Sequence, residues 1–584
     1  MSRDYRVFKL RLNQWHSVFQ ELTSELDQSN HSIVNLVIYQ KALSPKEVWE
    51  IWEYSLKQKN NTNEGAFISD EKILFESGLN HQPNKDGVYT YRIPALLKTQ
   101  EGTLIAGADQ RWEHFRDWGT IAMVVRRSED KGESWQEIQT LVKLRDNPLA
   151  PKGKSHLDEY SDSPVNIDMV LVQDHLSKTK RIFSIYDMYP AGRGIFGMTD
   201  SPEQEYSQMD QKSYLNLYKV DQKDHKEKGI YTVRENGVVY APDGQPTDYH
   251  VVIVSTQKNY SDLGDIYHGK KRIGNIYFTS YKSSPFRIAK SNYIWLSYSD
   301  DDGKSWSSPR DITANLRHPG IKFLGVGPGA GIVLRHGAYA GRIVVPAYST
   351  NWLSHLESSQ SSRVIYSDDH GESWQLGDAV NDNRLLENGE TIHSTSMDKR
   401  HVFDQNTESA VVQLKNGDLK LFLRNTAKAN CLQVATSKDG GKSFEKDLDI
   451  YGEVPEAYVQ LSAVAFERDQ KEYILLVNAN GPGDLRQDGY ARLAEVQADG
   501  SLKWLSHRLL QAGKFAYNCV QMIDDHHFGV LYEHSKGNQN DFNLIFKTFN
   551  WQYLTEGFTK QEQGKISFSQ LSVKDFFFIC QQLF

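Results

Sequence analysis

Short apolar or aromatic runs recur along the chain, and each is followed by a polar turn. TIAMVV, YIWLSY, RVIY and CLQVAT are such runs, and they predict β-strands. After each comes the pattern Ser-x-Asp-x-Gly-x-Ser-aromatic, in copies that begin at Ser128, Ser299, Ser367 and Ser437. In a turn of this kind the Asp accepts backbone N–H bonds, the Gly supplies a positive φ, and the aromatic side chain anchors the hairpin.

The spacing of these turns predicts a β-propeller. By subtraction, Ser299, Ser367 and Ser437 are 68 and 70 residues apart, whereas Ser128 and Ser299 are 171 residues apart. A repeat of this length with several short strands is typical of propeller blades, which bury their apolar faces against one another. The longer interval predicts an insertion at residues 194–286. Its segment GIYTVRENGVVYAPDGQPTDYHVVIV alternates apolar strands with Asn-Gly and Asp-Gly turns, so we expect a small β subdomain.

The acidic stretch YSDDDGKSW also suggests a calcium loop, but its ligand positions do not fit one. When Gly303 is placed at the sixth position of an EF-hand loop, Tyr298 occupies the first position, where an Asp is needed. Pro309 then stands where the bidentate Glu belongs. The three cysteines have neither metal-ligand spacing nor the pattern of a disulfide framework. We therefore interpret the stretch as a turn on the rim of a blade, and nothing in the sequence demands a cofactor.

Length and charge narrow the function classes. A chain of 584 residues is too long for one ordinary core, so two to four domains or a repeat architecture with attachments are expected. The 67 Lys and Arg residues are interspersed with 75 Asp and Glu residues, giving a net charge of -8. This balance argues against nucleic acid or an anionic membrane held by bulk charge. No apolar run is long enough to predict a transmembrane segment.

Three arginines stand in unusual surroundings. Arg92 in YTYRIPALL and Arg424 in KLFLRNT interrupt apolar strands, and Arg486 lies on the Gly-rich loop GPGDLRQDG. A guanidinium within a buried strand is unfavourable unless it is paired. Each arginine is therefore either part of a structural ion pair or part of a site that captures an anion.

In combination, these features resemble the bacterial exo-sialidases. The resemblance rests on YRIP near the start, the four turns of the kind called Asp boxes, NTESAVVQL with an arginine sixteen residues after its glutamate, and FAYN near the end. It covers roughly residues 75–553 and looks closest to the large surface sialidases of the sialidase A type. Each motif alone is weak, whereas the ordered set is specific.

The resemblance implies an all-β fold, a six-bladed β-propeller with an inserted β domain. We expect the propeller at residues 75–553 and the inserted subdomain at 194–286. Residues 1–57 resemble the last part of a jelly-roll lectin module and are too few to bury a core, so no independent lectin activity is expected. Residues 58–74 are expected to be a linker and 554–584 a C-terminal tail. The family is secreted or held at the cell surface, yet neither a signal peptide nor a wall anchor is evident, which suggests an N-terminally truncated chain.

The resemblance also assigns catalytic roles. Tyr517 matches the nucleophile, Glu408 its partner base and Asp117 the acid/base residue. Sialic acid carries a carboxylate on its anomeric carbon, so a neutral phenol avoids the repulsion that a carboxylate nucleophile would meet, but a phenol needs a base beside it. Tyrosine is the known nucleophile of sialidases among glycosidases. The competing interpretations are a half-buried strand tyrosine for Tyr517 and an ordinary Asp-Trp-Gly turn for Asp117.

The remaining matches concern substrate binding. Arg92, Arg424 and Arg486 match the triad that holds the sialic acid carboxylate, for which planar guanidinium forks are suited. Glu533 matches the carboxylate that steadies Arg92, with a plain surface glutamate as the alternative. Five further residues match positions that contact the N-acetyl, hydroxyl and glycerol groups: Ile93, Arg111, Asp168, Tyr348 and Gln360.

We therefore expect a retaining exo-α-sialidase that removes terminal α-linked sialic acid from glycoproteins, glycolipids and oligosaccharides through a tyrosyl intermediate. Two enzymatic alternatives use the same scaffold, an intramolecular trans-sialidase and an eliminating sialidase. A third alternative is a propeller that binds sialylated glycans or a protein without catalysis. A pure binder has no reason to keep Asp117, Glu408 and Tyr517 together, and that set discriminates between the classes.

Overall fold

The computed structural model describes residues 37–38, 65–80, 82–149, 163–191, 203–220, 227–279, 282–351, 359–481, 485–535, 542–556 and 566–567. The chain divides into two compact units, residues 68–550 and a smaller unit of residues 1–67 with 551–584. In the smaller unit, β1 (Val37–Ile38) pairs antiparallel with β38 (Ile566–Ser567), and α3 spans Trp551–Thr555. The expected lectin remnant at 1–57 and tail at 554–584 lie largely outside the described residues. No helix in the described part of the chain is long and apolar enough to cross a membrane.

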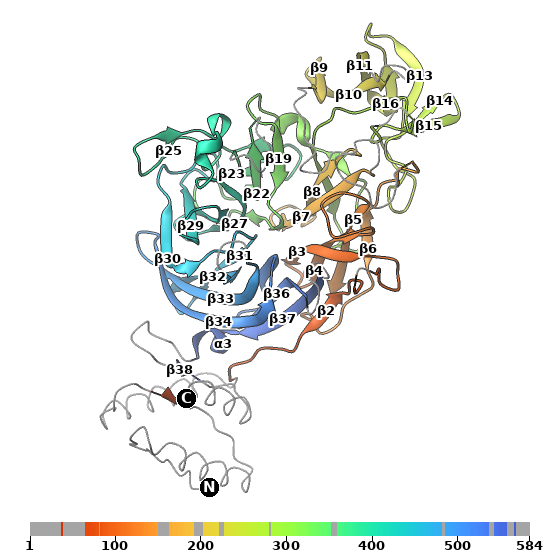
Figure 1. The fold of residues 1–584 in the computed structure, drawn as a ribbon. Helices are drawn as coiled ribbons and strands as arrows, with labels where there is room; N and C mark the ends of the chain where they lie inside the picture. The colour runs from red at the N-terminus through yellow and green to blue at the C-terminus, as the bar shows by residue number, and fades with distance from the viewer. Residues whose placement is uncertain are drawn as a thin grey trace. The chain divides into compact units, whose positions relative to one another are not determined.

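The larger unit is a β-propeller built from antiparallel groups of strands. Figure 1 shows the groups following one another around a common centre, and we number them in chain order. Groups 1 and 2 contain β3 (Thr90–Lys98), β4 (Leu104–Arg111), β5 (Ile121–Ser128) and β6 (Gln139–Val142), then β7 (Val165–Gln173), β8 (Ile182–Tyr189), β17 (Tyr293–Ser299) and β18 (Arg310–Asp311). A single parallel bridge between Ile121 and Val165 joins β5 to β7.

Group 3 contains two short inner strands and two longer ones, with an outer strand beside them. Its strands are β19 (Phe323–Val326), β21 (Ile332–Val333), β22 (Ile343–Thr350), β23 (Ser361–Ser367) and β24 (Gln375–Leu376). Nearby short elements are η4 (Thr313–Leu316), β20 (Gly329–Ala330), which pairs with β7, the hairpin of β25 (Arg384–Leu385) and β26 (Thr391–Ile392), η5 (Ser394–Ser396) and η6 (Lys399–His401).

Groups 4 to 6 complete the ring. Groups 4 and 5 contain β27 (Asn406–Gln413), β28 (Leu419–Asn425), β29 (Cys431–Ser437) and β30 (Asp449–Pro455), then β31 (Ser462–Arg468), β32 (Lys471–Ala479), β33 (Gln487–Val496) and β34 (Leu502–Lys514). Group 6 contains β35 (Asn518–Met522), β36 (His527–His534) and β37 (Asn543–Asn550), with β2 (Lys72–Phe75) as its outer strand.

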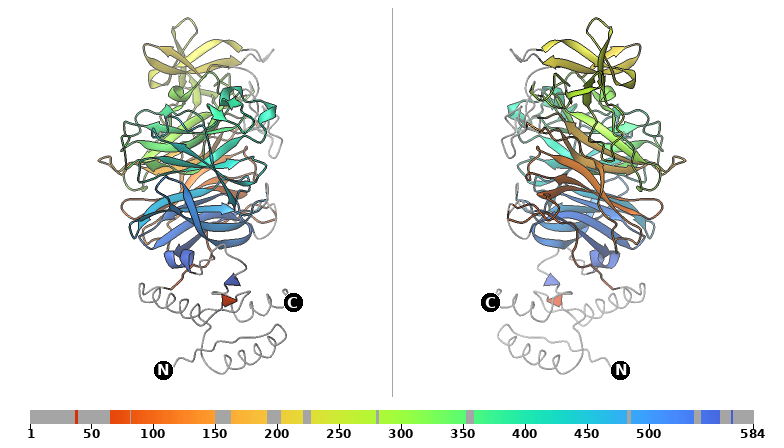
Figure 2. Two further views of the ribbon diagram at one scale, coloured as in Figure 1. Left: turned by 90° about the vertical axis from the view of Figure 1, so that its left-hand side faces the viewer. Right: turned by 90° about the vertical axis from the view of Figure 1, so that its right-hand side faces the viewer.

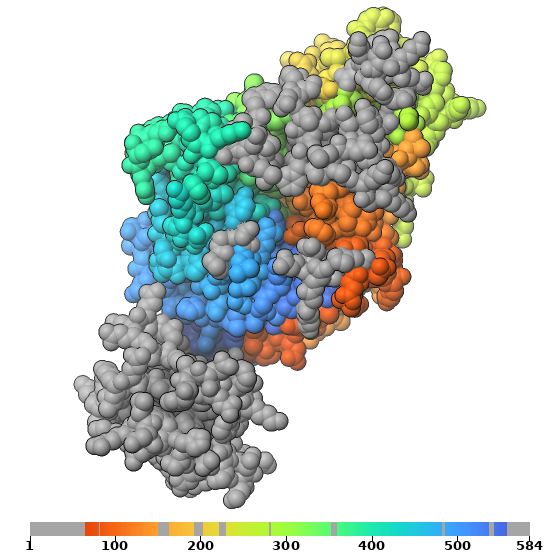
Figure 3. Space-filling model, in the orientation of Figure 1, coloured from red at the N-terminus to blue at the C-terminus, as the bar shows by residue number. Residues whose placement is uncertain are grey.

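The ring closes where β2 pairs with β37, so the two ends of the propeller chain share one group. The space-filling view shows the consequence, because the blue surface of group 6 adjoins the red and orange surface that begins the unit (Figure 3). Residues 72–75 thus belong to the propeller, which begins a few residues before the expected boundary between linker and propeller at residue 75.

The apolar cores lie between successive groups. One cluster joins Val344 and Val364 of group 3 to Val411 and Leu421 of group 4, and the other clusters likewise combine residues of neighbouring groups. Strands such as β4 and β8 are buried along their whole length, because a neighbouring group covers each face. Burial on both faces explains why these strands lack strict alternation of apolar and polar residues.

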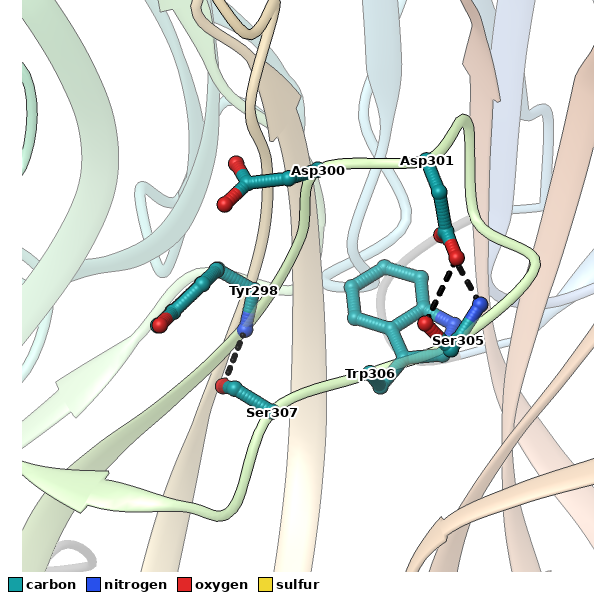
Figure 4. Close-up of a pocket in the computed structure, with 6 residues that line it drawn as sticks. All are labelled: Tyr298, Asp300, Asp301, Ser305, Trp306 and Ser307. Carbon is teal, nitrogen blue, oxygen red and sulfur yellow. Dashed lines mark hydrogen bonds between the residues drawn. The ribbon is translucent and has the colours of Figure 1, made fainter.

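The Asp boxes are turns between the two outer strands of a group, as the sequence predicts. In the box of group 2, Ser305 donates to Asp301 through its backbone N–H (2.9 Å) and its hydroxyl (2.6 Å), as Figure 4 shows. The N–H of Gly303 donates to the Ser299 hydroxyl at 2.8 Å. Trp306 is nearly buried beneath the turn. The Asp301 carboxylate thus bonds to its own turn, as the turn interpretation requires.

Each box also packs its glycine against the preceding group of the ring. All four box glycines have positive φ. A Cβ added to any of them would meet a side chain of the neighbouring group: Phe546 at Gly132, Ile105 at Gly303, Phe183 at Gly371 and Val364 at Gly441. The glycine is therefore required for two reasons, its backbone conformation and the close approach of the preceding group.

We expect Gly303→Ala to lower the free energy of unfolding by about 2 to 3 kcal/mol. The substitution forces an alanine into the left-handed backbone region and overpacks its contact with the neighbouring group. The added Cβ would lie 2.6 Å from Cδ1 of Ile105, and φ is 78°. Urea unfolding of the purified protein measures the change. Gly102→Ala is the matched control, since φ is 94° there but no atom lies within 4 Å, and it should lose only about 1 kcal/mol. Equal losses in both variants would contradict the packing role.

The insertion forms a sheet of its own between β8 and β17. Its strands are β9 (Tyr206–Met209), β10 (Lys212–Val220), β11 (Glu227–Val233), β12 (Val238–Tyr240), β13 (Pro246–Val251), β14 (Asp265–His268), β15 (Lys271–Asn275) and β16 (Phe286–Arg287), with η3 (Glu235–Gly237) before β12. Figure 2 shows this sheet, in yellow, beside the propeller groups of the same unit. Leu217, Val233 and Phe286 extend the core of the neighbouring groups into it.

Candidate active site

Two innermost strands depart from regular pairing at candidate site residues. The β3–β4 register shifts between Arg92 and Ala95, where Ile93 has φ 58°. The β7–β8 register shifts between Ile167 and Val170, where Asp168 has φ 63°. Positive φ is rare for aspartate and a strong outlier for isoleucine. Such bulges turn side chains out of the regular pleat and are concentrated beside active sites.

Arg92 and Glu533 form a buried ion pair that joins β3 to β36. The Glu533 carboxylate accepts from Nε of Arg92 at 2.9 Å and from Nη2 at 3.0 Å. It also accepts from the backbone N–H of Ile93 at 2.9 Å. Burial alone would lower the pKa of Arg92, but the charge of Glu533 more than offsets this and raises it. The surface-glutamate alternative for Glu533 is wrong, because its side chain is fully buried.

Tyr517, Glu408 and Arg424 form a second cluster. Tyr517 precedes β35, Glu408 lies where the β27–β28 register shifts, and Arg424 is near the end of β28. The Tyr517 hydroxyl donates to the Glu408 carboxylate at 2.8 Å and accepts from Nη1 of Arg424 at 3.0 Å. Nη1 of Arg424 also bonds the other Glu408 oxygen. A phenol with a carboxylate positioned to take its proton is the arrangement of an activated nucleophile.

All three predicted arginines surround Tyr517. The guanidinium carbons of Arg92 and Arg486 lie 5.4 and 5.5 Å from the centroid of its ring, and Arg424 bonds its hydroxyl. Burial and the charges of Arg424 and Arg92 lower the pKa of Arg486. This repulsion between like charges would be relieved by a bound anion, so the arrangement favours the entry of one.

The surroundings of Tyr517 keep its hydroxyl protonated in the resting state. Burial raises its pKa and the charge of Glu408 raises it further, while Arg424, Arg486 and Arg92 lower it. The raised pKa means that Tyr517 requires Glu408 as a base before it can attack. The half-buried strand tyrosine proposed as its alternative would have no need of such a partner.

Asp117 lies in the loop between β4 and β5, held by Arg111. Nη1 of Arg111 donates to Oδ1 of Asp117 at 2.7 Å and to the carbonyl of Phe115 at 2.6 Å. The Asp117 side chain is 36% exposed, so substrate can reach it. Partial burial raises its pKa, but Arg111 and Arg92 outweigh this effect and lower it. Trp118, which follows it, is almost wholly buried.

The other expected pocket residues differ in how they connect to this site. Arg111 contacts it directly through Asp117, and the charges of Glu408 and Asp117 act on the buried carboxyl of Asp168, whose pKa burial raises. Tyr348 is buried, and burial followed by the Glu408 charge raises its pKa. The side chain of Gln360 donates to the Tyr458 hydroxyl at 3.5 Å. Contacts of these residues with substrate groups stay predictions.

Two residues near the site were not predicted from sequence. The ring of Tyr458 lies 4.2 Å from the guanidinium carbon of Arg424, and no motif marks that tyrosine. Asp109 is fully buried, and its carboxylate accepts from Nη2 of Arg111 at 2.8 Å. Asp109 stands two positions before Arg111 in a strand, so both side chains point to the same face. The two-residue spacing of Asp109 and Arg111 is the sequence signal from which their contact could have been predicted.

Comparisons with known proteins agree with the propeller fold and its Asp-box repeats. Residues 270–530 match the family model of the BNR repeat-like domain. The anhydrosialidase of the leech Macrobdella decora is 30% identical over 491 residues, which are 78% of this chain and 59% of the relative. Sialidase B of Streptococcus pneumoniae is 26% identical over 546 residues, 88% of this chain and 69% of the relative. The chain thus spans less than two thirds of the leech protein.

Solved structures of intramolecular trans-sialidases also match this chain in fold. The leech intramolecular trans-sialidase, in complex with 2,7-anhydro-Neu5Ac, matches with a TM-score of 0.65 and 26% identity, covering 88% of this chain and 74% of that one. The intramolecular trans-sialidase of Ruminococcus gnavus matches with a TM-score of 0.65 and 24% identity, covering 83% of this chain and 98% of that one, and supports the fold. A particular likeness to the sialidase A type stays a prediction. The Asp boxes, the propeller and these relatives together show that the chain is similar to sialidases.

Proposed function

We propose that the chain is a retaining exo-α-sialidase that acts on terminal α-linked sialic acid of glycoproteins, glycolipids and oligosaccharides. One observation carries the proposal: the hydroxyl of Tyr517 lies between the carboxylate of Glu408 and the guanidinium of Arg424, with Arg92 and Arg486 beside its ring. An anion held by the arginines would place the carbon that bears it next to this hydroxyl.

The proposed reaction begins with capture of the sialic acid carboxylate by the three arginines. Glu408 takes the proton of Tyr517 while the phenol oxygen attacks the anomeric carbon, and the bond to the aglycone breaks. Asp117 gives its proton to the departing sugar oxygen and then takes one from the incoming nucleophile. Because the anomeric carbon is inverted twice, the product keeps its configuration.

Asp117 must hold a proton in the complex, although its pKa is lowered in the substrate-free protein. Two of the causes are the charges of Arg92 and Arg486. A bound carboxylate would neutralise those charges, and the covering substrate would add desolvation, so both changes raise the pKa of Asp117. Substrate binding itself would therefore prepare the acid.

An intramolecular transfer is the second candidate, and the leech relatives favour it. In that reaction a hydroxyl of the bound sialic acid, instead of water, attacks the tyrosyl intermediate. The Macrobdella decora relative is named an anhydrosialidase, and the matching structure of a leech intramolecular trans-sialidase holds 2,7-anhydro-Neu5Ac. Elimination to an unsaturated sugar would use the same intermediate. A binder without catalysis is disfavoured, because it gives no account of the Tyr517–Glu408 pair.

The reaction of 3′-sialyllactose in water enriched in ¹⁸O tests these proposals. Hydrolysis is expected to release lactose and sialic acid that carries one ¹⁸O at its anomeric carbon. Internal transfer would give a product that is lighter than sialic acid by one water molecule and carries no label. NMR would distinguish it from the unsaturated sugar that elimination gives. Absence of any lactose release, where a reference sialidase works, would contradict the enzymatic function and leave a binding propeller.

The substrate class supports a location outside the cell or on its surface, where sialylated glycans are displayed. This location is part of the proposal, and it is motivated by the sialidase family resemblance.

A further inference from the structure

Asp109 is a wholly buried carboxylate that joins two parts of the pocket. Its Oδ2 accepts from Nη2 of Arg111 at 2.8 Å, and its Oδ1 accepts from the backbone N–H of Asp168 at 3.2 Å. Asp168 has the positive φ described above, so this bond helps to hold the bulge of β7. Asp109 thereby ties the inner strand β7 to β4.

Arg111 forms ion pairs with two carboxylates but carries one positive charge. Its Nη2 bonds Asp109 and its Nη1 bonds Asp117 at 2.7 Å. Arg111 is 1% exposed and Asp109 is not exposed at all, so water screens this contact weakly. The Arg92–Glu533 pair is balanced one to one, whereas here one guanidinium faces two carboxylates. Both acids can be ionised together only at an electrostatic cost.

We propose that Asp109 is a positioning residue whose carboxylate shares the charge of Arg111 with Asp117, and so sets whether Asp117 holds the proton needed by the departing sugar. The inference rests on the proposed role of Asp117 as acid. It adds a residue that acts through Arg111 and does not touch the substrate.

The titration of the pair agrees with its geometry. Burial raises the pKa of Asp109 to about 7, although Arg111 opposes the shift. The pKa of Asp117 is lowered instead. In the substrate-free protein Asp109 therefore holds a proton more tightly than Asp117 does. The pKa of nearby His114 is lowered to about 4 by burial and by Arg111, so this side chain is neutral near pH 7. The groups that face the pair are Arg92, Arg111, His114, Asp168, Asp187, Tyr189 and Arg486.

The direction of the pH dependence follows from these charges. Below about pH 7 Asp109 is protonated, and the charge of Arg111 acts on Asp117 alone. As the pH rises through about 7, Asp109 ionises and offsets that charge, which raises the pKa of Asp117. With the substrate carboxylate on the other arginines, Asp117 then keeps its proton to a higher pH than it would without Asp109.

Asp109→Asn tests the proposal through the pH profile of kcat on two substrates. Lactose is a poor leaving group that needs an acid, whereas 4-methylumbelliferone leaves without one. Below about pH 6 the variant should act like the wild type on both. Above pH 7 the basic limb of the pH profile of kcat for 3′-sialyllactose should move to lower pH by about one unit. At a fixed alkaline pH this shift is a tenfold loss of kcat. The umbelliferyl sialoside should lose much less. An equal loss at every pH and on both substrates would overturn the proposal.

Asp174→Asn is the matched control. Asp174 is also fully buried, but its carboxylate accepts from the backbone N–H of Leu176 and bonds Nδ1 of His370, away from Arg111. Its variant should leave the rate ratio of the two substrates unchanged at each pH. A change in that ratio as large as the change in Asp109→Asn would assign the effect to general loss of buried charge and overturn the role of Arg111.

Proton uptake provides a readout that needs no turnover. Calorimetry of sialic acid binding near pH 7, in two buffers of different ionisation enthalpy, measures the protons taken up per ligand. The wild type should take up a fraction of a proton as the carboxylate neutralises the arginines, and Asp109→Asn should take up clearly less. Zero uptake by the wild type would overturn the inference. Failure of the proposed function would be seen separately, as a wild type that binds sialic acid and releases no lactose.

Discussion

Replacing Tyr517 by phenylalanine is expected to lower kcat on 3′-sialyllactose by about a thousandfold or more, because the attacking oxygen is removed. In the described part of the chain the hydroxyl bonds Glu408 and Arg424, and those two residues also bond each other. They therefore stay paired in the variant, and the melting temperature should change little. Steady-state kinetics and thermal unfolding measure the two effects.

Tyr186→Phe is the control for loss of a buried phenol. Tyr186 is fully buried and its hydroxyl bonds the Ser297 hydroxyl at 2.8 Å, within group 2 of the propeller. That variant should keep its kcat. A Tyr517→Phe enzyme with wild-type turnover, or a Tyr186→Phe enzyme with an equal loss of turnover, would contradict the role assigned to Tyr517.

Glu533→Gln is expected to destabilise the fold by about 3 kcal/mol, since it leaves the buried Arg92 without its counter-charge. Glu533 also accepts from the backbone N–H of Ile93, where φ is positive, so the bulge of β3 loses support. The KM for sialosides should rise together with the loss of stability, because Arg92 is no longer held. Urea unfolding and steady-state kinetics at a temperature where the variant is folded measure both effects.

An exposed ion pair gives the comparison for Glu533. Lys415 bonds Glu467 at 2.7 Å with both side chains open to solvent, so Glu467→Gln should leave the unfolding midpoint and the KM unchanged. If Glu533→Gln behaved like this exposed variant in both measurements, the Arg92–Glu533 pair would have no part in binding or stability.

The sequence was sufficient for the propeller because the Asp box is a local signal. Its Asp, Gly and aromatic residues lie within eight positions, and their hydrogen bonds are made within the same turn. The strand β2 carries no comparable signal. It has four residues, and its partner β37 begins at Asn543, far along the chain. Only closure of the ring explains why Lys72–Phe75 is a strand.

The site could be anticipated only in part. The arginines are visible as charges in apolar strands, but their convergence on Tyr517 required the family resemblance. Arg92 and Glu533 are 441 residues apart, and no periodicity links residues at that distance. The ion-pair and anion-site interpretations of Arg92 are compatible in the structure, because its pairing with Glu533 leaves the guanidinium close to the Tyr517 ring. Asp109 could not be assigned a role from sequence, since its importance depends on the second hydrogen bond of Arg111.

The most direct test of the account is to trap the covalent intermediate. A 3-fluorosialosyl fluoride should react readily because fluoride leaves easily, while the fluorine beside the anomeric carbon slows hydrolysis of the intermediate. Mass spectrometry of the treated wild type should show one fluorosialosyl group per chain, on the peptide that contains Tyr517, and none on Tyr517→Phe. A wild type that turns over sialosides without labelling, or a label on any other residue, would contradict Tyr517 as the nucleophile.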